Sequence, residues 1–126
     1  MNVTLEQAQW LKEQGYPQDL RVQRLWGQFD FGGKLSEWEL CWPLNDPEDE
    51  PLYHKACAAP HPIDALDWLE REKAVDWHRR QRNSWVNTYV AIVVATALND
   101  NDPGEMRAIY ASTPLELLDK IMAAKP

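Results

Sequence analysis

The chain has 126 residues, the length of one ordinary domain, and a formal net charge of −7 from 13 Lys and Arg against 20 Asp and Glu. This acidic balance argues against general binding to nucleic acid or to an anionic membrane, because both surfaces would repel the chain. No apolar run is long enough to span a bilayer, and no basic stretch precedes an apolar block at the N-terminus, so neither a membrane span nor a secretory signal is expected.

The first predicted element is a helix over residues 4–14. Thr4 and Gln7 have the spacing of a capping box, in which each side chain satisfies a free backbone N–H at the start of a helix. Gly15 and then Pro17 supply the stop.

From residue 21 to residue 44 the apolar residues recur with a period of two, which indicates β-structure. Gly32–Gly33 separates two aromatic-rich runs and predicts a hairpin with strands near 22–30 and 36–42. Residues 45–51 hold four acids and two prolines, so we expect a solvent-exposed loop there. A short strand is a candidate over 52–57.

Two later segments begin alike. Pro62 and Pro114 each stand where a first helical residue is expected, with an acid two residues later and apolar residues at helical spacing. Thr113 and Glu116 form a second predicted capping box. A true repeat is one interpretation, but shared helix-start chemistry accounts for the similarity, so we expect two separate helices at 62–72 and 114–124.

Between these helices, residues 85–97 predict a central strand. Its alternate positions are β-branched on one side and apolar on the other, which favours a strand covered on both faces. A buried helix is the alternative for an apolar run of this length. Strands are also expected at 74–80 and 106–110, with a turn at 98–104.

The elements together predict an α+β fold. We expect a mainly antiparallel sheet of about five strands covered by three helices, in the order α-β-β-β-α-β-β-β-α, as a single domain over 1–126.

Three segments carry a family resemblance: 5–18 (Leu-Glu-Gln-Ala…Gly-Tyr-Pro-Gln), 59–69 (Ala-Pro-His-Pro…Asp-Trp-Leu) and 111–118 (Ala-Ser-Thr-Pro-Leu-Glu-Leu-Leu). In this pattern the chain resembles small uncharacterised accessory proteins of phages and prophages with a helix–sheet–helix sandwich-like domain. The resemblance implies a phage or prophage origin, and the two cysteines, Cys41 and Cys57, favour a reduced, cytoplasmic setting, so we expect the cytoplasm of a bacterial host cell. It transfers no catalytic residue to any position of this chain.

Basic and aromatic residues gather near the middle of the acidic chain, where residues 71–82 hold five of the 13 basic side chains. Arginine forks match phosphate or carboxylate oxygens, and indole faces stack on bases, so a small anionic, nucleotide-like ligand suits this segment. The predicted ligand-binding residues are Trp77, His78, Arg79, Arg80, Arg82 and Trp85. The alternative is a hairpin whose tip carries solvated arginines while the tryptophans pack in the core.

Residue type alone would allow a zinc site, because the side chains of Cys41, His54, Cys57 and His61 are of the types that bind tetrahedral zinc. No paired Cys-x-x-Cys is present, and free cysteine is commonly a small core residue of a reduced protein, so we expect no metal and no cofactor. Nucleophile-elbow, zinc-protease and phosphate-loop motifs are also missing, and we expect no enzyme.

The tryptophans divide into two expected groups. Trp38, Trp42 and Trp68 are expected in the core. The others exceed what a small core needs and indicate a ligand platform or a homo-oligomer interface: Trp10, Trp26, Trp77 and Trp85.

The function expected from these features is a non-enzymatic accessory protein that counteracts host defence by sequestering a small anionic ligand. One alternative is an acidic inhibitor that occupies a basic surface of a host protein. An enzyme acting on nucleotides is the third possibility.

Overall fold

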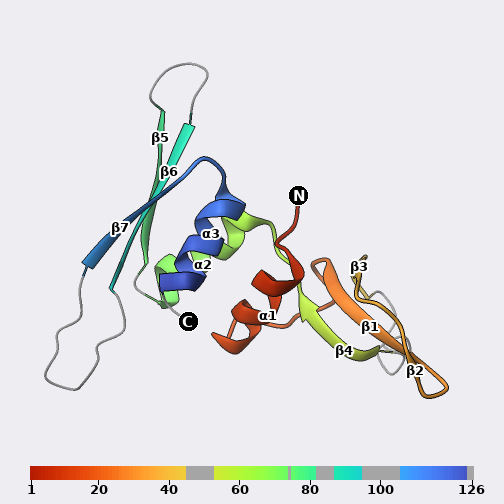
Figure 1. Ribbon diagram of the computed structural model, residues 1–126. Helices are drawn as coiled ribbons and strands as arrows, with labels where there is room; N and C mark the ends of the chain where they lie inside the picture. Colours follow the sequence, from red (N-terminus) through yellow and green to blue (C-terminus); the bar gives the residue numbers. More distant parts are fainter. Residues whose placement is uncertain (45–52, 74, 82–86, 95–105, 125–126) are drawn as a thin grey trace, which may run out of the picture. The chain divides into compact units, whose positions relative to one another are not determined.

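The computed structural model describes residues 1–44, 53–73, 75–81, 87–94 and 106–124 (Figure 1). Over these residues it contains three helices and seven strands, and every strand pair is antiparallel, which confirms the α+β class. The strands form two sheets, of four and three strands. The backbone contacts divide the chain into two compact units, Met1–His61 and Pro62–Pro126, which are described in turn. The expected single domain over 1–126 stays a prediction.

Helix α1 of the first unit spans Leu5–Glu13, and its predicted start is confirmed. The Thr4 hydroxyl accepts a hydrogen bond from the Gln7 N–H at 3.2 Å, and the Gln7 side chain accepts one from the Thr4 N–H at 3.0 Å. At the other end Gly15 has φ 98°, a conformation that strains other residues, and the following Tyr16 N–H donates to the Leu11 carbonyl. Local chemistry therefore sets both ends of this helix.

The sheet of the first unit contains β1 (Leu25–Phe31), β2 (Lys34–Leu35), β3 (Glu39–Cys41) and β4 (Tyr53–Ala58). Strand β1 is central: it pairs with β2 and β3 on one side of the ladder and with β4 on the other (Figure 1). The candidate strand at 52–57 is thus confirmed with a shift of one residue, as β4.

The predicted hairpin at Gly32–Gly33 is confirmed, but its second strand is interrupted. Both glycines have positive φ, 62° and 95°, and the Asp30 carboxylate accepts a hydrogen bond from the Gly33 N–H at 2.9 Å. Of the expected strand at 36–42 only residues 39–41 are a strand, as β3, while β2 precedes it at Lys34–Leu35. At the break the Ser36 hydroxyl accepts a hydrogen bond from the Phe29 N–H at 2.9 Å, so a side chain satisfies the donor that a regular ladder would bond to a carbonyl.

Hydrogen bonds from the N-terminal segment hold α1 against the sheet. The Val3 N–H donates to the Pro60 carbonyl at 3.0 Å, and the Val3 carbonyl accepts from the Trp26 indole N–H at 3.0 Å. The Lys12 ammonium donates to the Ala56 carbonyl at 3.0 Å. Leu11 and Leu25 are fully buried between these contacts. The core of the first unit therefore lies where α1, β1 and β4 meet.

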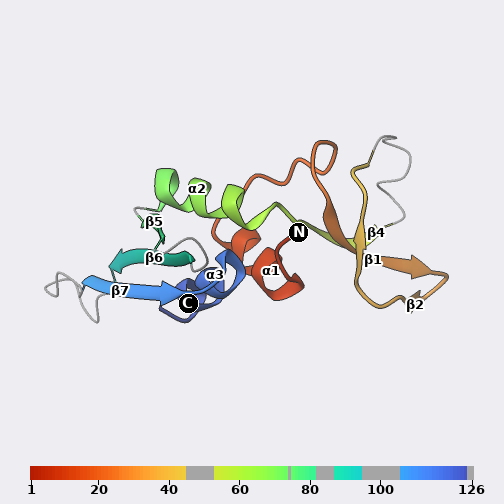
Figure 2. The same cartoon turned by 90° about the horizontal axis from the view of Figure 1, so that it is seen from above.

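The second unit consists of α2 (Pro62–Glu72), β5 (Asp76–Gln81), β6 (Asn87–Val94), β7 (Met106–Ala111) and α3 (Pro114–Ala124). Its sheet has the order β5-β6-β7, and Figure 1 shows α2 and α3 together on one side of it. Figure 2 shows the same three strands side by side from above. Both predicted helices are confirmed with their predicted bounds, 62–72 and 114–124.

Strand β6 settles the ambiguity over residues 85–97, because its residues 87–94 form the central strand and not a buried helix. Ala91 and Val93 are fully buried under the helices, together with Leu66, Leu69, Leu117, Leu118 and Ile121. Within this unit the helices cover one face of β6, and on the other face Val90 is also buried while Thr88 and Ile92 are half-buried. On the other face the neighbouring residues of β5 and β7 are exposed, among them Met106 and Tyr110.

Two predicted turns lie outside the described residues: the acidic loop at 45–51 and the turn at 98–104.

Candidate site on the outer face of the second sheet

Strand alternation divides the residues predicted to bind a ligand. Successive side chains of a strand point to opposite faces, so Trp77 and Arg79 of β5 lie on the face that α2 and α3 cover, whereas His78 and Arg80 lie on the other. Arg82 and Trp85 lie outside the described residues. The structure therefore brings together two of the six predicted residues as neighbours, His78 and Arg80.

We call the uncovered side of this sheet the outer face. Residues directly opposite each other in an antiparallel ladder share a face, so the register defines its membership. It consists of Asp76, His78 and Arg80 from β5, Thr88, Val90 and Ile92 from β6, and Met106, Ala108 and Tyr110 from β7.

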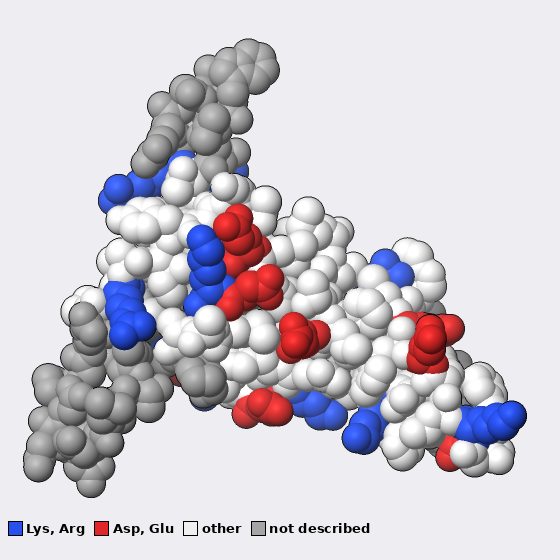
Figure 3. All heavy atoms as spheres, viewed as in Figure 1, with Lys and Arg blue, Asp and Glu red and all other residues white. Residues whose placement is uncertain are grey.

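Arg80 and His78 contact each other directly on the outer face. The Arg80 Nε donates a hydrogen bond to the His78 Nε2 at 3.1 Å, so this imidazole nitrogen acts as an acceptor. The other N–H groups of the guanidinium donate to no group within the described residues. Figure 3 shows basic side chains at the end of β5, beside the grey residues. The contact orients the guanidinium and leaves donors for an anion.

The neighbours of this pair across the ladder are Thr88 and Val90. Thr88 stands opposite Arg80, and its hydroxyl can both donate and accept a hydrogen bond. Val90 stands opposite His78, and the half-exposed phenol ring of Tyr110 stands opposite Val90 on β7. Thr88 and Tyr110 were not among the predicted site residues. Alternation in the sequence assigns a residue to a face, but only the register shows which residue of the next strand stands beside it.

On the covered face, Trp77 has a buried indole N–H that donates no hydrogen bond to any described residue. Arg79 is exposed at the same face, two residues further along β5. The tryptophan thus belongs to the edge of the core, as the alternative interpretation of this segment proposed, while both arginines reach solvent.

The tryptophans of the first unit lie where they were not expected. Trp42 was expected in the core, yet its side chain is 75% exposed and its ring lies 4.4 Å from the guanidinium carbon of Arg24. Trp10, expected in surplus at the surface, is buried. Trp68 is buried in α2 as expected, and Trp38 is half-buried. Trp38 and Trp42 lie just outside β3 (Glu39–Cys41), so the predicted strand face did not determine whether the sheet covers them.

Neither cysteine shows the environment of a reactive thiol. Cys57 is buried, and its burial raises the pKa of the thiol, an effect that Lys12 and Lys55 partly oppose. Cys41 is half-buried on β3. Within the described part of the chain, no group of three or more His, Cys, Asp or Glu side chains is arranged to hold a metal ion.

Comparisons with known proteins add no relative: no family model, no curated protein and no solved structure matches this chain. In the described residues, no helix combines the length and the apolar character that crossing a membrane requires.

Proposed function

We propose that this protein is a non-enzymatic binding protein that captures an anionic group of a small, nucleotide-like ligand on the outer face of the second sheet. The observation that carries the proposal is the Arg80–His78 contact, which orients the guanidinium on an exposed strand at the position opposite Thr88. The role as a phage accessory protein, implied by the sequence resemblance, and the cytoplasm of a bacterial host, favoured by the low cysteine content, belong to the same proposal.

The surrounding residues support an anion with an apolar or aromatic part. Arg80 supplies a positive charge and hydrogen-bond donors at one end of the outer face, where His78 orients it, and Val90 and Tyr110 continue the same face with an aliphatic side chain and a phenol ring. A phosphate can engage the guanidinium while an attached ring lies against the exposed phenol ring of Tyr110. The net charge of −7 disfavours binding of a polyanion more than binding of one small anion. The many phosphates of a polyanion would be repelled by the whole acidic surface.

The test compares two adjacent arginines that point to opposite faces. We expect Arg80→Ala to weaken binding of AMP by about tenfold or more, because a hydrogen bond to a charged group contributes about 1.5–3 kcal/mol. Arg79→Ala, which removes the same charge from the covered face, is the matched control and leaves the affinity within about twofold, since screening weakens a charge at that distance. Titration calorimetry with AMP and with inorganic phosphate measures both.

Equal losses in the two variants would show that AMP responds only to overall charge, and would contradict a site at Arg80. Absence of AMP and phosphate binding by the wild-type protein would contradict the proposal outright.

A second candidate function, binding of a host protein, is favoured by a different observation. In the first unit, Trp42 and Phe31 are 75% and 68% exposed, and Phe31 stacks on Phe29 with ring centroids 5.9 Å apart. Exposed aromatic side chains are typical of protein interfaces. A host partner held mainly by these rings loses little affinity as salt rises, whereas a partner held by charge mimicry loses much of it.

A further inference from the structure

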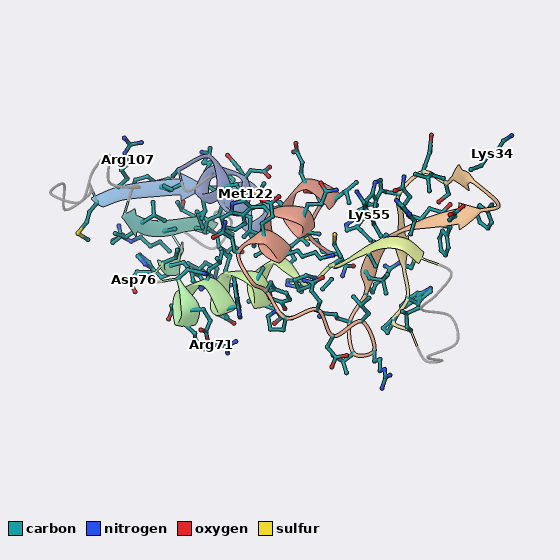
Figure 4. The ribbon with its side chains drawn as sticks, turned by 90° about the horizontal axis from the view of Figure 1, so that it is seen from below. Lys34, Lys55, Arg71, Asp76, Arg107 and Met122 are labelled. Atoms are coloured by element: carbon teal, nitrogen blue, oxygen red, sulfur yellow. The ribbon has the colours of Figure 1, made fainter. Side chains whose placement is uncertain are left out.

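The two edges of the second sheet differ in how they are covered. On β7, the Lys120 ammonium from α3 donates to the Tyr110 carbonyl at 2.7 Å, so a charged side chain of the same unit lies against that edge strand. Strand β5, at the opposite edge, pairs with β6 alone among the residues that the structure describes. Figure 4 shows Asp76 and Arg107 on these two opposite edge strands.

The sequence of β5 is complementary to itself about His78. Asp76 and Arg80 lie two residues before and after it on the outer face, and they carry opposite charges. Trp77 and Arg79 lie one residue before and after it on the covered face, an aromatic ring and a guanidinium. Within the described residues, Asp76, Arg79 and Arg80 form no ion pair.

Symmetry limits how two β5 strands can pair. Residues opposite each other in an antiparallel ladder share a face. If a two-fold axis relates two β5 strands in one continuous sheet, with both outer faces on the same side, that axis passes through a residue position, and the residue there lies opposite its own copy. An axis at Arg79 places that arginine against its own copy and His78 against the partner's Arg80, which brings positive charges together. An axis at His78 places Asp76 against the partner's Arg80, and Trp77 against the partner's Arg79, each twice.

We propose that the protein forms a homodimer in which β5 of two copies pairs antiparallel about His78, giving one six-stranded sheet. The pairing satisfies the edge of β5, forms two Asp76–Arg80 ion pairs on the shared outer face and stacks Trp77 on the partner's Arg79. The homo-oligomer expected from the surplus of tryptophans thus acquires a specific interface.

The dimer does not rest on the proposed function, although both use Arg80. Bound phosphate and the partner's Asp76 would compete for that guanidinium, so the two proposals together predict that inorganic phosphate weakens the dimer. Asp76 takes no part in the proposed anion site, so variants at this position test the dimer separately.

The experiment exploits charge reversal and mixing. Asp76→Arg gives a chain with two positive residues at these positions, and Arg80→Asp gives a chain with two negative ones. We expect each variant alone to self-associate at least about tenfold more weakly than the wild type, because like charges then face each other twice. An equimolar mixture restores association as a heterodimer, and the double variant D76R/R80D restores the homodimer. Sedimentation equilibrium measures the association constants, and circular dichroism checks folding.

Arg107→Asp, a charge reversal on the opposite edge strand β7, is the matched control and leaves the association constant unchanged. A wild-type protein that remains a monomer up to the highest soluble concentration overturns the proposal. A dimer that persists in both single variants also overturns it, as does a mixture that associates no better than its components. If the charge variants behave as expected while phosphate has no effect, the dimer stands and the proposed anion site at Arg80 is contradicted.

Discussion

The two units of this chain hold their helices by different means. In the first unit, hydrogen bonds to backbone carbonyls from Val3, Trp26 and Lys12 supplement a core in which Leu11 and Leu25 are fully buried. In the second, α2 and α3 cover the sheet with fully buried aliphatic side chains such as Leu66 and Leu118. Hydrogen bonds are directional and contribute about 1 kcal/mol each, whereas a buried leucine contributes several times that. The difference predicts that single substitutions have larger effects in the second unit.

The largest effect is expected from Leu118→Ala in α3. The side chain is fully buried, and its truncation removes apolar contacts and leaves a cavity, which lowers the free energy of unfolding by about 3 kcal/mol. Urea denaturation measures the loss, and faster amide hydrogen exchange in β6 and β7 locates it. Leu115→Ala, at a half-buried position of the same helix, is the control with a smaller loss. Equal losses at the two positions would contradict a core centred on Leu118.

A smaller effect is expected from Trp26→Phe in the first unit. Phenylalanine keeps most of the apolar area but removes the indole N–H that donates to the Val3 carbonyl, at a cost of about 1 kcal/mol. The control is Trp42→Phe, which changes the stability by no more than about 0.5 kcal/mol because that ring is exposed. If the two substitutions had the same effect in urea denaturation, the bond to Val3 would not attach the N-terminal segment.

The smallest effect concerns the helix caps, and it depends on pH. The Glu116 carboxylate at the start of α3 accepts a hydrogen bond from the Ser112 N–H at 3.1 Å and lies 3.3 Å from the Lys120 ammonium, and these contacts lower its pKa. Because the pKa of Glu116 is lower in the folded than in the unfolded state, the ionised carboxylate stabilises the fold at pH values above the unfolded-state pKa of this side chain. The stabilisation is lost as the pH falls through its folded-state pKa.

We therefore expect Glu116→Gln to lower the melting temperature slightly at neutral pH and to leave it unchanged in acid, below the lowered pKa. Thermal melts of both proteins across this range measure the difference. At the start of α1 the uncharged Gln7 accepts from the N–H of the N-cap Thr4, whereas Glu116 accepts from Ser112, one residue before the N-cap Thr113. Gln7→Glu is therefore the converse variant and introduces a pH dependence at α1. A difference between wild type and Glu116→Gln that is constant across the pH range would contradict the assignment.

Features set by local chemistry were predictable from sequence. The cap at Thr4 and Gln7, the turn at Gly32–Gly33 and the first turns of α2 and α3 each depend on a few consecutive residues. The division of the strands between two sheets was not predicted, because it depends on which strands pair with β1. In the structure β1 pairs with both β3 and β4.

The candidate site shows the same limit. The local excess of basic residues around Arg79 and Arg80 was evident from the sequence, and these residues were predicted to form one cluster. In an extended strand consecutive side chains point to opposite faces, so these two arginines lie on opposite faces of the sheet because they are neighbours in sequence. Thr88 entered the site only through the register of β6 against β5.

The bond between Val3 and Pro60 has a consequence for how the chain folds during synthesis. The segment before α1 takes its partners from the stretch that follows β4, since Asn2 also donates to the Ala59 carbonyl across 57 positions of sequence. During translation Ala59 and Pro60 are synthesised long after α1. In the meantime the nascent helix can form its capping hydrogen bonds, but not the hydrogen bonds that join the N-terminal segment to Ala59 and Pro60. The first unit thus becomes complete only when Pro60 has left the exit tunnel, at which point translation of the second unit is already under way.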